Sequence, residues 1–302
     1  MTQTSLSARA WAELLLLGLI WGGSFLAIRI ALDEIGPLTV VLFRTGLGAA
    51  ALWLVVLARG IAVPRDMRLW GALAVMGLLN NVIPFSLMAW GQLHIETGLT
   101  AILNAATAIF GVLVAALVFA DERLTPRRLG GVSLGFAGVV LAIGPDALGG
   151  FDLTSLAQLA VIAGTVSYAC ASAWGRARLG GLHPVMAAAG MLTGATILVA
   201  PVTVIAEGLP SLALGAATWG GILYYALAAT AFAYLLYYRV LAMAGAGNLM
   251  LVTLVIPPVA IGLGAWIRDE RLAPLALAGF ALIAAGLMVM NSRRAGRTRK
   301  PV

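Results

Sequence analysis

Long apolar stretches, each about as long as a bilayer is thick, follow one another along the whole chain. A helix needs about 20 apolar residues to cross the hydrocarbon core of a membrane. Stretches close to this length occupy residues 10–31, 38–58, 69–92, 97–119, 127–144, 154–177, 185–205, 216–240, 247–267 and 275–291. The loops between them are short and rich in glycine, proline and charge, as turns outside a membrane are. The pattern predicts an all-α membrane protein with ten transmembrane helices.

The second half of the chain repeats the first. Residues 121–126 read Asp-Glu-Arg-Leu-Thr-Pro, and residues 269–274 read Asp-Glu-Arg-Leu-Ala-Pro, 148 positions later. In each copy a proline marks the expected start of a helix, and Thr125 is expected to cap the first of them. The same offset pairs glycines of the two halves, Gly131 with Gly279 and Gly138 with Gly286.

Each copy of the repeat holds five predicted spans. Because five is odd, the second copy must enter the membrane from the opposite side. We therefore expect two inverted five-helix repeats, residues 1–150 and 151–291, followed by a basic tail, 292–302. Inverted repeats of this kind build alternating access around a midplane site in many secondary transporters.

Composition and charge agree with a membrane protein and give its orientation. The chain is 62% hydrophobic and 10% charged, with a mean hydropathy of +1.01, and a soluble protein of this length could not cover so much apolar surface. With the N-terminus inside, 15 of the 19 basic residues fall on the inner side. This positive-inside bias predicts that both termini are cytoplasmic. The tail is expected to face anionic lipid and not a nucleic acid, and the single cysteine, Cys170, excludes a disulfide framework.

Polar side chains near the middle of the spans are the candidates for a substrate site, because a polar group in lipid is costly and usually faces a cavity. Amides and hydroxyls can donate to a carboxylate and accept from an ammonium, and aromatic rings can stack on a substrate. The competing explanation for each residue is a hydrogen bond that only joins two helices. The predicted substrate-binding residues are Trp21, Ser24, Asn80, Asn81, Asn104, Thr107, Ser167, Tyr168, Tyr224, Tyr234 and Thr253.

Arg44, in the second predicted helix, and three prolines allow two interpretations each. Arg44 lies about two turns into its helix, where it could bind a substrate carboxylate. The favoured interpretation is that Arg44 snorkels to the outer surface or bonds helix-end carbonyls or the nearby acids, Asp33 and Glu34. Pro84, Pro257 and Pro258 free backbone carbonyls within their helices, and they are predicted either to act as hinges or to make packed structural kinks.

The chain resembles the drug/metabolite transporter superfamily, in its EamA-like branch. The resemblance rests on Trp21-Gly22-Gly23-Ser24-Phe25, on Arg44, and on the Asp-Glu-Arg-Leu turn followed by a glycine-rich helix in both halves. It covers about residues 10–291 and implies a ten-helix inverted-repeat bundle with cytoplasmic termini. Within the family the chain is most similar to YddG-type amino-acid exporters. Related members move sugars, nucleotide sugars, cations and drugs.

These observations predict a transporter of the bacterial inner membrane that exports small metabolites, with aromatic or other neutral amino acids as the leading class. The predicted cavity is walled by the first, third, fourth, sixth, eighth and ninth helices, with the fifth and tenth outside it. No acidic residue lies at mid-span, which favours facilitated diffusion over ion coupling.

Multidrug or other metabolite efflux remains the alternative transport function. An intramembrane enzyme is disfavoured because His94 and His183 lie at helix ends and no metal-ligand cluster is evident. We expect no cofactor, no metal and no partner beyond substrate and lipid, with the chain a monomer or alternatively a dimer.

Overall fold

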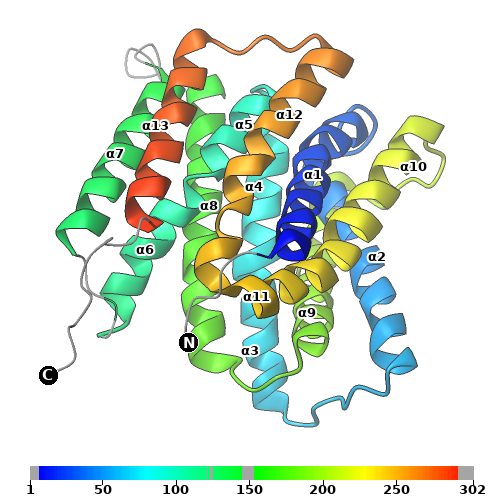
Figure 1. Cartoon of the computed structure of the whole chain (residues 1–302). Coiled ribbons are helices and arrows are strands. Elements are labelled where there is room, and N and C mark those ends of the chain that lie inside the picture. The colour runs from blue at the N-terminus through cyan, green and yellow to red at the C-terminus, as the bar shows by residue number, and fades with distance from the viewer. Residues whose placement is uncertain (1–6, 121, 123–124, 145–152, 292–302) are drawn as a thin grey trace, which may run out of the picture.

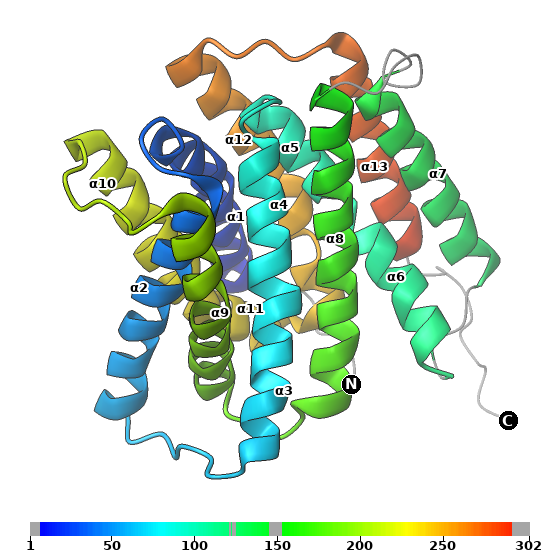
Figure 2. The ribbon, with the colours of Figure 1, turned by 180° about the vertical axis from the view of Figure 1, so that it is seen from behind.

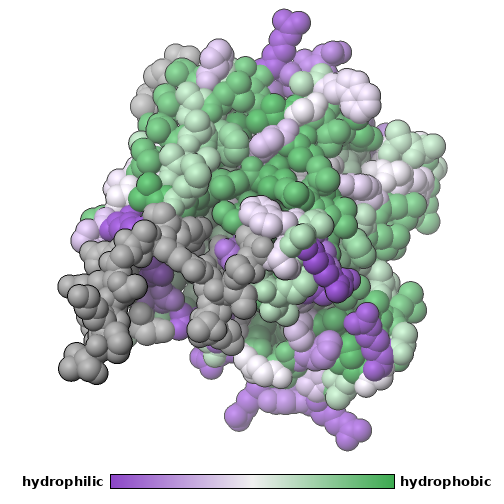
Figure 3. All heavy atoms as spheres, viewed as in Figure 1, coloured by the Kyte–Doolittle hydropathy of each residue, from purple (hydrophilic) through white to green (hydrophobic). Residues whose placement is uncertain are grey.

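The computed structural model describes residues 7–120, 122, 125–144 and 153–291, and in this part of the chain every regular element is helical. Most of the repeated turn at 121–126, the acids Asp146 and Asp152, and the basic tail 292–302 lie outside the described residues. Figure 3 shows a largely apolar upper and middle part of this face, with strongly polar residues at the top and across the lower half.

The first half forms four helical runs and the helix that follows them. They are α1 (Ala8–Ala31), α2 (Pro37–Ala58), the run α3 (Met67–Gly77), η1 (Leu78–Val82) and α4 (Ile83–Gly91), the pair α5 (Thr97–Asn104) and α6 (Thr107–Val118), and α7 (Pro126–Ile143). The label η marks a π-helix, whose turns are wider than those of an α-helix.

The second half repeats this succession. It comprises α8 (Leu153–Arg178), α9 (Pro184–Glu207), the run α10 (Ala216–Leu223), η3 (Tyr224–Phe232) and α11 (Ala233–Leu249), then α12 (Val252–Arg268) and α13 (Pro274–Asn291). Among the described residues, eight helical runs are long and apolar enough to cross a membrane, and α12 and α13 are shorter apolar helices. The membrane class predicted from the sequence is therefore confirmed, while the count of ten spans stays a prediction.

Local sequence explains where the helices begin and where they break. The Thr125 hydroxyl accepts a hydrogen bond from the Arg128 backbone N–H, with Pro126 next in the chain, so the predicted cap is confirmed. The predicted fourth span is broken at Ala105 and Ala106. The predicted eighth span runs further than expected, to Gly245, whose φ of 76° suits glycine, and the residues of α11 after it, up to Leu249, form a separate short helix.

Helices α7 and α13 pack side by side at one edge of the bundle, and α2 and α10 lie toward the opposite edge (Figures 1 and 2). Glycines allow the close approach of α7 and α13, because a Cβ at Gly131 would lie 2.7 Å from the Gly286 carbonyl oxygen. A Cβ at Gly138 would lie 2.6 Å from the Gly279 carbonyl oxygen. These contacts are the small-residue packing typical of membrane helices, and they leave the middle of the bundle to the other helices.

Candidate functional site: a polar cluster among four helical runs

The polar cluster begins at the π-helix η1, which carries Asn80 and Asn81 in the third run. Pro84, the second residue after η1, has no N–H to donate to the carbonyls of the preceding turn. The Ser167 hydroxyl of α8 donates to the Leu79 carbonyl oxygen at 2.7 Å and fills that vacancy. The asparagines are thus held in a distorted turn whose backbone is satisfied from another helix.

The eighth run contributes the second π-helix, η3, which is held in a similar way. The Thr230 hydroxyl donates to the Tyr225 carbonyl oxygen, five residues earlier, at 2.8 Å. The Trp21 indole N–H of α1 donates to the Ala229 carbonyl oxygen at 3.1 Å. Each π-helix therefore has one carbonyl occupied by a side chain of a distant helix.

Tyr234, in α11, links the two runs through the amides. The Asn80 amide nitrogen donates to the Tyr234 hydroxyl at 3.1 Å, and that hydroxyl lies 3.4 Å from the Asn81 amide oxygen. Asn81 is completely buried. The amide nitrogen of Asn81 and the hydroxyl of Tyr225 are buried without a hydrogen-bond partner, and such groups call for an explanation because an unmade buried hydrogen bond is costly.

Arg44 completes the cluster, and the favoured prediction for this residue is wrong. Its side chain is buried and does not reach the surface. The Nε–H donates to the Thr230 hydroxyl at 3.0 Å, and the guanidinium carbon lies 3.8 Å from the centre of the Phe85 ring. The hydroxyls of three tyrosines are within electrostatic range of the guanidinium: Tyr168, Tyr225 and Tyr234.

The acids proposed as partners of Arg44 are engaged elsewhere, at the end of the bundle that carries the loop between α1 and α2. We call this the upper end, as it stands in Figure 1. Asp33 pairs with Arg268 at 2.6 Å and with Arg29 at 2.9 Å. The hydrogen bond from Arg268 lowers the pKa of Asp33. Glu34 accepts from the Thr218 hydroxyl and the Gly215 N–H, and these bonds lower the pKa of Glu34.

Two other carboxylates join helices at the same end. Glu207, the last residue of α9, accepts hydrogen bonds from two N–H groups and a hydroxyl at the start of α2. Glu270 accepts from the Thr97 N–H and hydroxyl at the start of α5. A negative charge at a helix N-terminus is stabilising, so these groups hold the upper end together.

The structure brings five of the eleven predicted substrate-binding residues into contact with the cluster: Asn80, Asn81, Ser167, Tyr168 and Tyr234. The Tyr168 ring lies 6.4 Å from the Phe85 ring, which faces Arg44. Trp21 borders the cluster, because its N–H is taken by the backbone of η3. Ser24 donates within its own helix, to the Trp21 carbonyl oxygen.

The remaining predicted residues lie apart from the cluster. Tyr224 is partly exposed and donates to the Ile20 carbonyl oxygen, while its neighbour Tyr225 points inward. Thr107 and Thr253 each donate to a carbonyl three residues earlier, at the breaks before α6 and α12. Asn104 supplies one of those carbonyls. For the threonines the competing explanation, local support of the helix, is the one that these contacts favour.

The predicted substrate-binding residues omit Tyr225, Thr230 and Phe85 of the cluster, and Arg44 was considered as a carboxylate-binding residue but assigned to the surface. The sequence does indicate that Arg44 is unusual, because no acidic residue lies within one helical turn of it to neutralise its charge. Tyr225 and Tyr224 are adjacent, and only the tertiary structure decides which of them points inward. Phe85 is one of many apolar residues in its span, so the sequence could not single it out.

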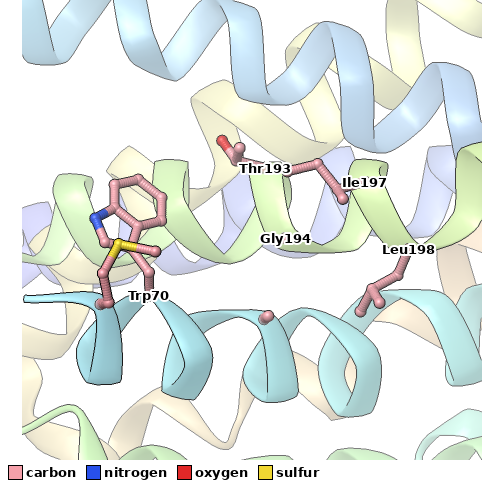
Figure 4. A pocket seen from close by; sticks show the side chains of 7 residues that line it. Trp70, Thr193, Gly194, Ile197 and Leu198 are labelled. Carbon is pink, nitrogen blue, oxygen red and sulfur yellow. The ribbon is translucent and has the colours of Figure 1, made fainter.

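Two pockets among the described residues lie away from the cluster. One of about 350 Å³ lies between α3 and α9 and is lined mainly by apolar side chains, Trp70 and Ile197 among them (Figure 4). The other, of about 140 Å³, lies between α6 and α8. The central cavity stays a prediction, and the polar cluster remains the better candidate site because it carries the groups that can recognise a polar substrate. Among the described residues no group of three His, Cys, Asp or Glu side chains could hold a metal ion.

Comparison with known proteins agrees with this arrangement. The family model described as "EamA-like transporter family" matches the chain twice, over residues 10–144 and 155–292. A protein of Streptantibioticus cattleyicolor named "Probable terminal-alkyne amino-acid exporter" is 29% identical over 98% of this chain and 97% of its own length. A protein of Escherichia coli named "Probable amino-acid metabolite efflux pump" is 25% identical over 91% of this chain and 92% of its own.

One solved crystal structure aligns with 93% of this chain and 96% of its own, with a TM-score of 0.66 at 20% identity. At that identity the likeness establishes the fold alone. The family match covers nearly the whole chain, and both its matched segments fall within the apolar helical bundle. The chain therefore belongs to the EamA-like transporter family of the drug/metabolite transporter superfamily, and it is a multi-pass membrane transporter and not an enzyme.

Proposed function

We propose that this protein exports small metabolites, and in particular amino acids with aromatic or other neutral side chains, across the inner membrane of a bacterium. The observation that carries the proposal is the buried cluster of amides, hydroxyls, aromatic rings and one cation among four helical runs. Such groups can hold both ends of a zwitterion. The names of the two relatives, an amino-acid exporter and an amino-acid metabolite efflux pump, support the same substrate class.

Transport is proposed to occur by alternating access between two inverted five-helix repeats, residues 1–150 and 151–291. The double match of the family model supports this division. So do the glycine contacts of α7 and α13, in which Gly131 meets Gly286 and Gly138 meets Gly279. Because the repeat pairs Gly131 with Gly279 and Gly138 with Gly286, these contacts are reciprocal, as a two-fold axis between antiparallel helices requires.

In this scheme both termini are cytoplasmic and the upper end faces outward. The carboxylate contacts there must break and re-form during each cycle, since the cavity has to open to each side in turn. We also propose that the cycle needs no coupling ion. No acidic side chain or histidine contacts the cluster among the described residues, and a coupling ion needs differential contacts in the two states.

Counterflow in proteoliposomes tests the proposal. Purified protein is reconstituted in vesicles loaded with an unlabelled amino acid, with pH and sodium equal on both sides, and uptake of the labelled amino acid is measured for a panel of neutral amino acids. We expect exchange above protein-free vesicles for at least one neutral amino acid. An imposed pH step should then cause no accumulation above equilibrium. Exchange of a cationic dye such as ethidium without exchange of any amino acid would instead establish multidrug efflux.

A further inference from the structure

Arg44 is a buried cation with no anion beside it. The residue is only 8% exposed, and among the described residues no carboxylate forms an ion pair with it. The acids nearest in sequence, Asp33 and Glu34, are bound to other groups at the upper end. A charge taken out of water is costly unless a counter-charge and hydrogen bonds compensate it. Nothing in the described part of the protein supplies the counter-charge.

The hydrogen-bonding capacity of Arg44 is also mostly unused. A guanidinium has five N–H donors in a fixed fork. The Nε–H is used by the Thr230 hydroxyl, and one face of the group lies over the Phe85 ring. These two contacts fix the plane of the guanidinium, while its terminal nitrogens, Nη1 and Nη2, make no hydrogen bond with a described residue. An oriented and unoccupied fork is the geometry that accepts a carboxylate through two parallel hydrogen bonds.

Other groups of the cluster are unoccupied donors too. The Tyr225 hydroxyl, within electrostatic range of Arg44, and the Asn81 amide nitrogen are both buried without a partner. Asn81 is joined to the same cluster through Tyr234. An unpaired cation together with buried donors that lack acceptors indicates that the missing component is an anion.

We propose that Arg44 is the receptor for a single carboxylate of the transported substrate, which it binds through Nη1 and Nη2, with the Tyr225 hydroxyl and the Asn81 amide as further donors. This proposal rests on the transport function proposed above and specifies the substrate class. One guanidinium balances one negative charge, and among the described residues no other cation makes a hydrogen bond or an ion pair with a residue of the cluster. A monocarboxylate therefore fits better than a phosphate dianion.

The principal test compares acid and amide forms of one probe in the unaltered protein. L-Phenylalanine, L-phenylalaninamide, 3-phenylpropionate and 3-phenylpropionamide are tested as inhibitors of amino-acid counterflow. We expect both carboxylates to inhibit, and both amides to require at least about 30-fold higher concentration, as expected when a buried charge pair loses one partner. Equal inhibition by acid and amide would overturn the proposal.

Arg44→Gln provides the second test, because glutamine removes the charge but can still donate to the Thr230 hydroxyl. We expect a rise of at least about 30-fold in the half-saturating concentration and loss of the discrimination between acid and amide. If Arg44 only supported η3, this variant would keep both properties. Arg178→Gln, which removes an exposed arginine at the end of α8, is the matched control.

Thermal unfolding of the detergent-purified protein separates failure of this inference from failure of the transport function. Carboxylates should raise the midpoint of the unaltered protein, and amides should not, since a ligand stabilises the state to which it binds. Stabilisation by carboxylates without counterflow of any amino acid would contradict only the proposed function. Amino-acid counterflow with equal stabilisation by acid and amide would contradict only the inference. Neither counterflow nor stabilisation by any of the four probes would contradict both.

Discussion

The two π-helices occupy the same place in the two halves of the chain, the third and the eighth helical runs, but they are built from different chemistry. In η1 the distortion is coupled to Pro84, and the polar side chains are the amides of Asn80 and Asn81. In η3 no proline is present, and the hydroxyl of Thr230 holds the wide turn by bonding to the Tyr225 carbonyl oxygen.

The side chains that support the two segments also differ. The Ser167 hydroxyl of α8 bonds to η1, and the Trp21 indole of α1 bonds to η3. Serine and tryptophan come from the first helix of opposite halves, so each half supplies a donor to the π-helix of the other. The comparison indicates that a repeated backbone design has been kept while its side chains diverged. One side of the site, the η1 wall, carries the amides of Asn80 and Asn81. The other side, the η3 wall, carries the Thr230 hydroxyl, which accepts from the Arg44 guanidinium of α2.

Among substitutions that compare the two π-helices, the largest effect is expected from Asn81→Ala, which removes the buried amide from the η1 wall. The Asn81 amide oxygen accepts a hydrogen bond from the Tyr234 hydroxyl, and the amide nitrogen is buried without a hydrogen-bond partner. We expect counterflow to fall at least about tenfold, since a buried donor or acceptor left unpaired costs about 1–3 kcal/mol. The folded yield should fall less than the rate.

Asn104→Ala is the matched amide substitution, because Asn104 lies at the break between α5 and α6. We expect it to change counterflow less than Asn81→Ala does. An equal loss in both variants would mean that the amides act through general packing and not through the cluster.

Thr230→Val breaks the η3 wall without changing the volume of the side chain. It removes both the bond to the Tyr225 carbonyl and the acceptor of the Arg44 Nε–H. Hydrogen bonds to charged groups contribute about 1.5–3 kcal/mol, so we expect about a tenfold loss of apparent substrate affinity in counterflow. Thr45→Val is the control, since the Thr45 hydroxyl is equally buried but bonds only within α2.

Trp21→Phe is expected to have a smaller effect than Thr230→Val. The ring centres of Trp21 and Tyr237 lie 6.0 Å apart. Phenylalanine keeps this aromatic contact but cannot donate to the Ala229 carbonyl. The rate of counterflow should fall a few-fold, with the half-saturating concentration nearly unchanged, because the indole supports η3 and does not line the unoccupied fork of Arg44. A large rise in that concentration would place Trp21 at the substrate after all.

Ser167→Ala should have the smallest effect, and it measures the support that α8 gives to η1. The Leu79 carbonyl would lose its side-chain donor, at a cost near the average of about 0.6 kcal/mol for such bonds between membrane helices. Unfolding by SDS in mixed micelles should show this loss. Ser24→Ala, which removes a bond within α1 only, should be nearer to neutral; a larger loss in that variant would reverse the ranking.

The sequence alone predicted the apolar helical bundle, most helix boundaries to within two residues and the family. These features follow from local rules: a bilayer sets the length of a span, and proline and its capping residue set where a helix begins. The repeat of Asp-Glu-Arg-Leu and the glycines that follow it is equally a property of the linear chain. It pointed to the α7 and α13 glycines that the structure brings into contact.

The tertiary structure decided which polar residues meet. Depth along a helix selected Asn80, Asn81, Ser167, Tyr168 and Tyr234 from the sequence, but depth cannot give the direction in which a side chain points. For that reason Tyr224 was preferred to Tyr225, and Arg44 was assigned to the surface. A wide π turn also rotates the residues that follow it relative to a regular helix, and the chain sequence carries no simple signal for it. Membrane insertion is fixed by the sum of local hydropathy, whereas a site is fixed by contacts between distant helices, which only the folded packing defines.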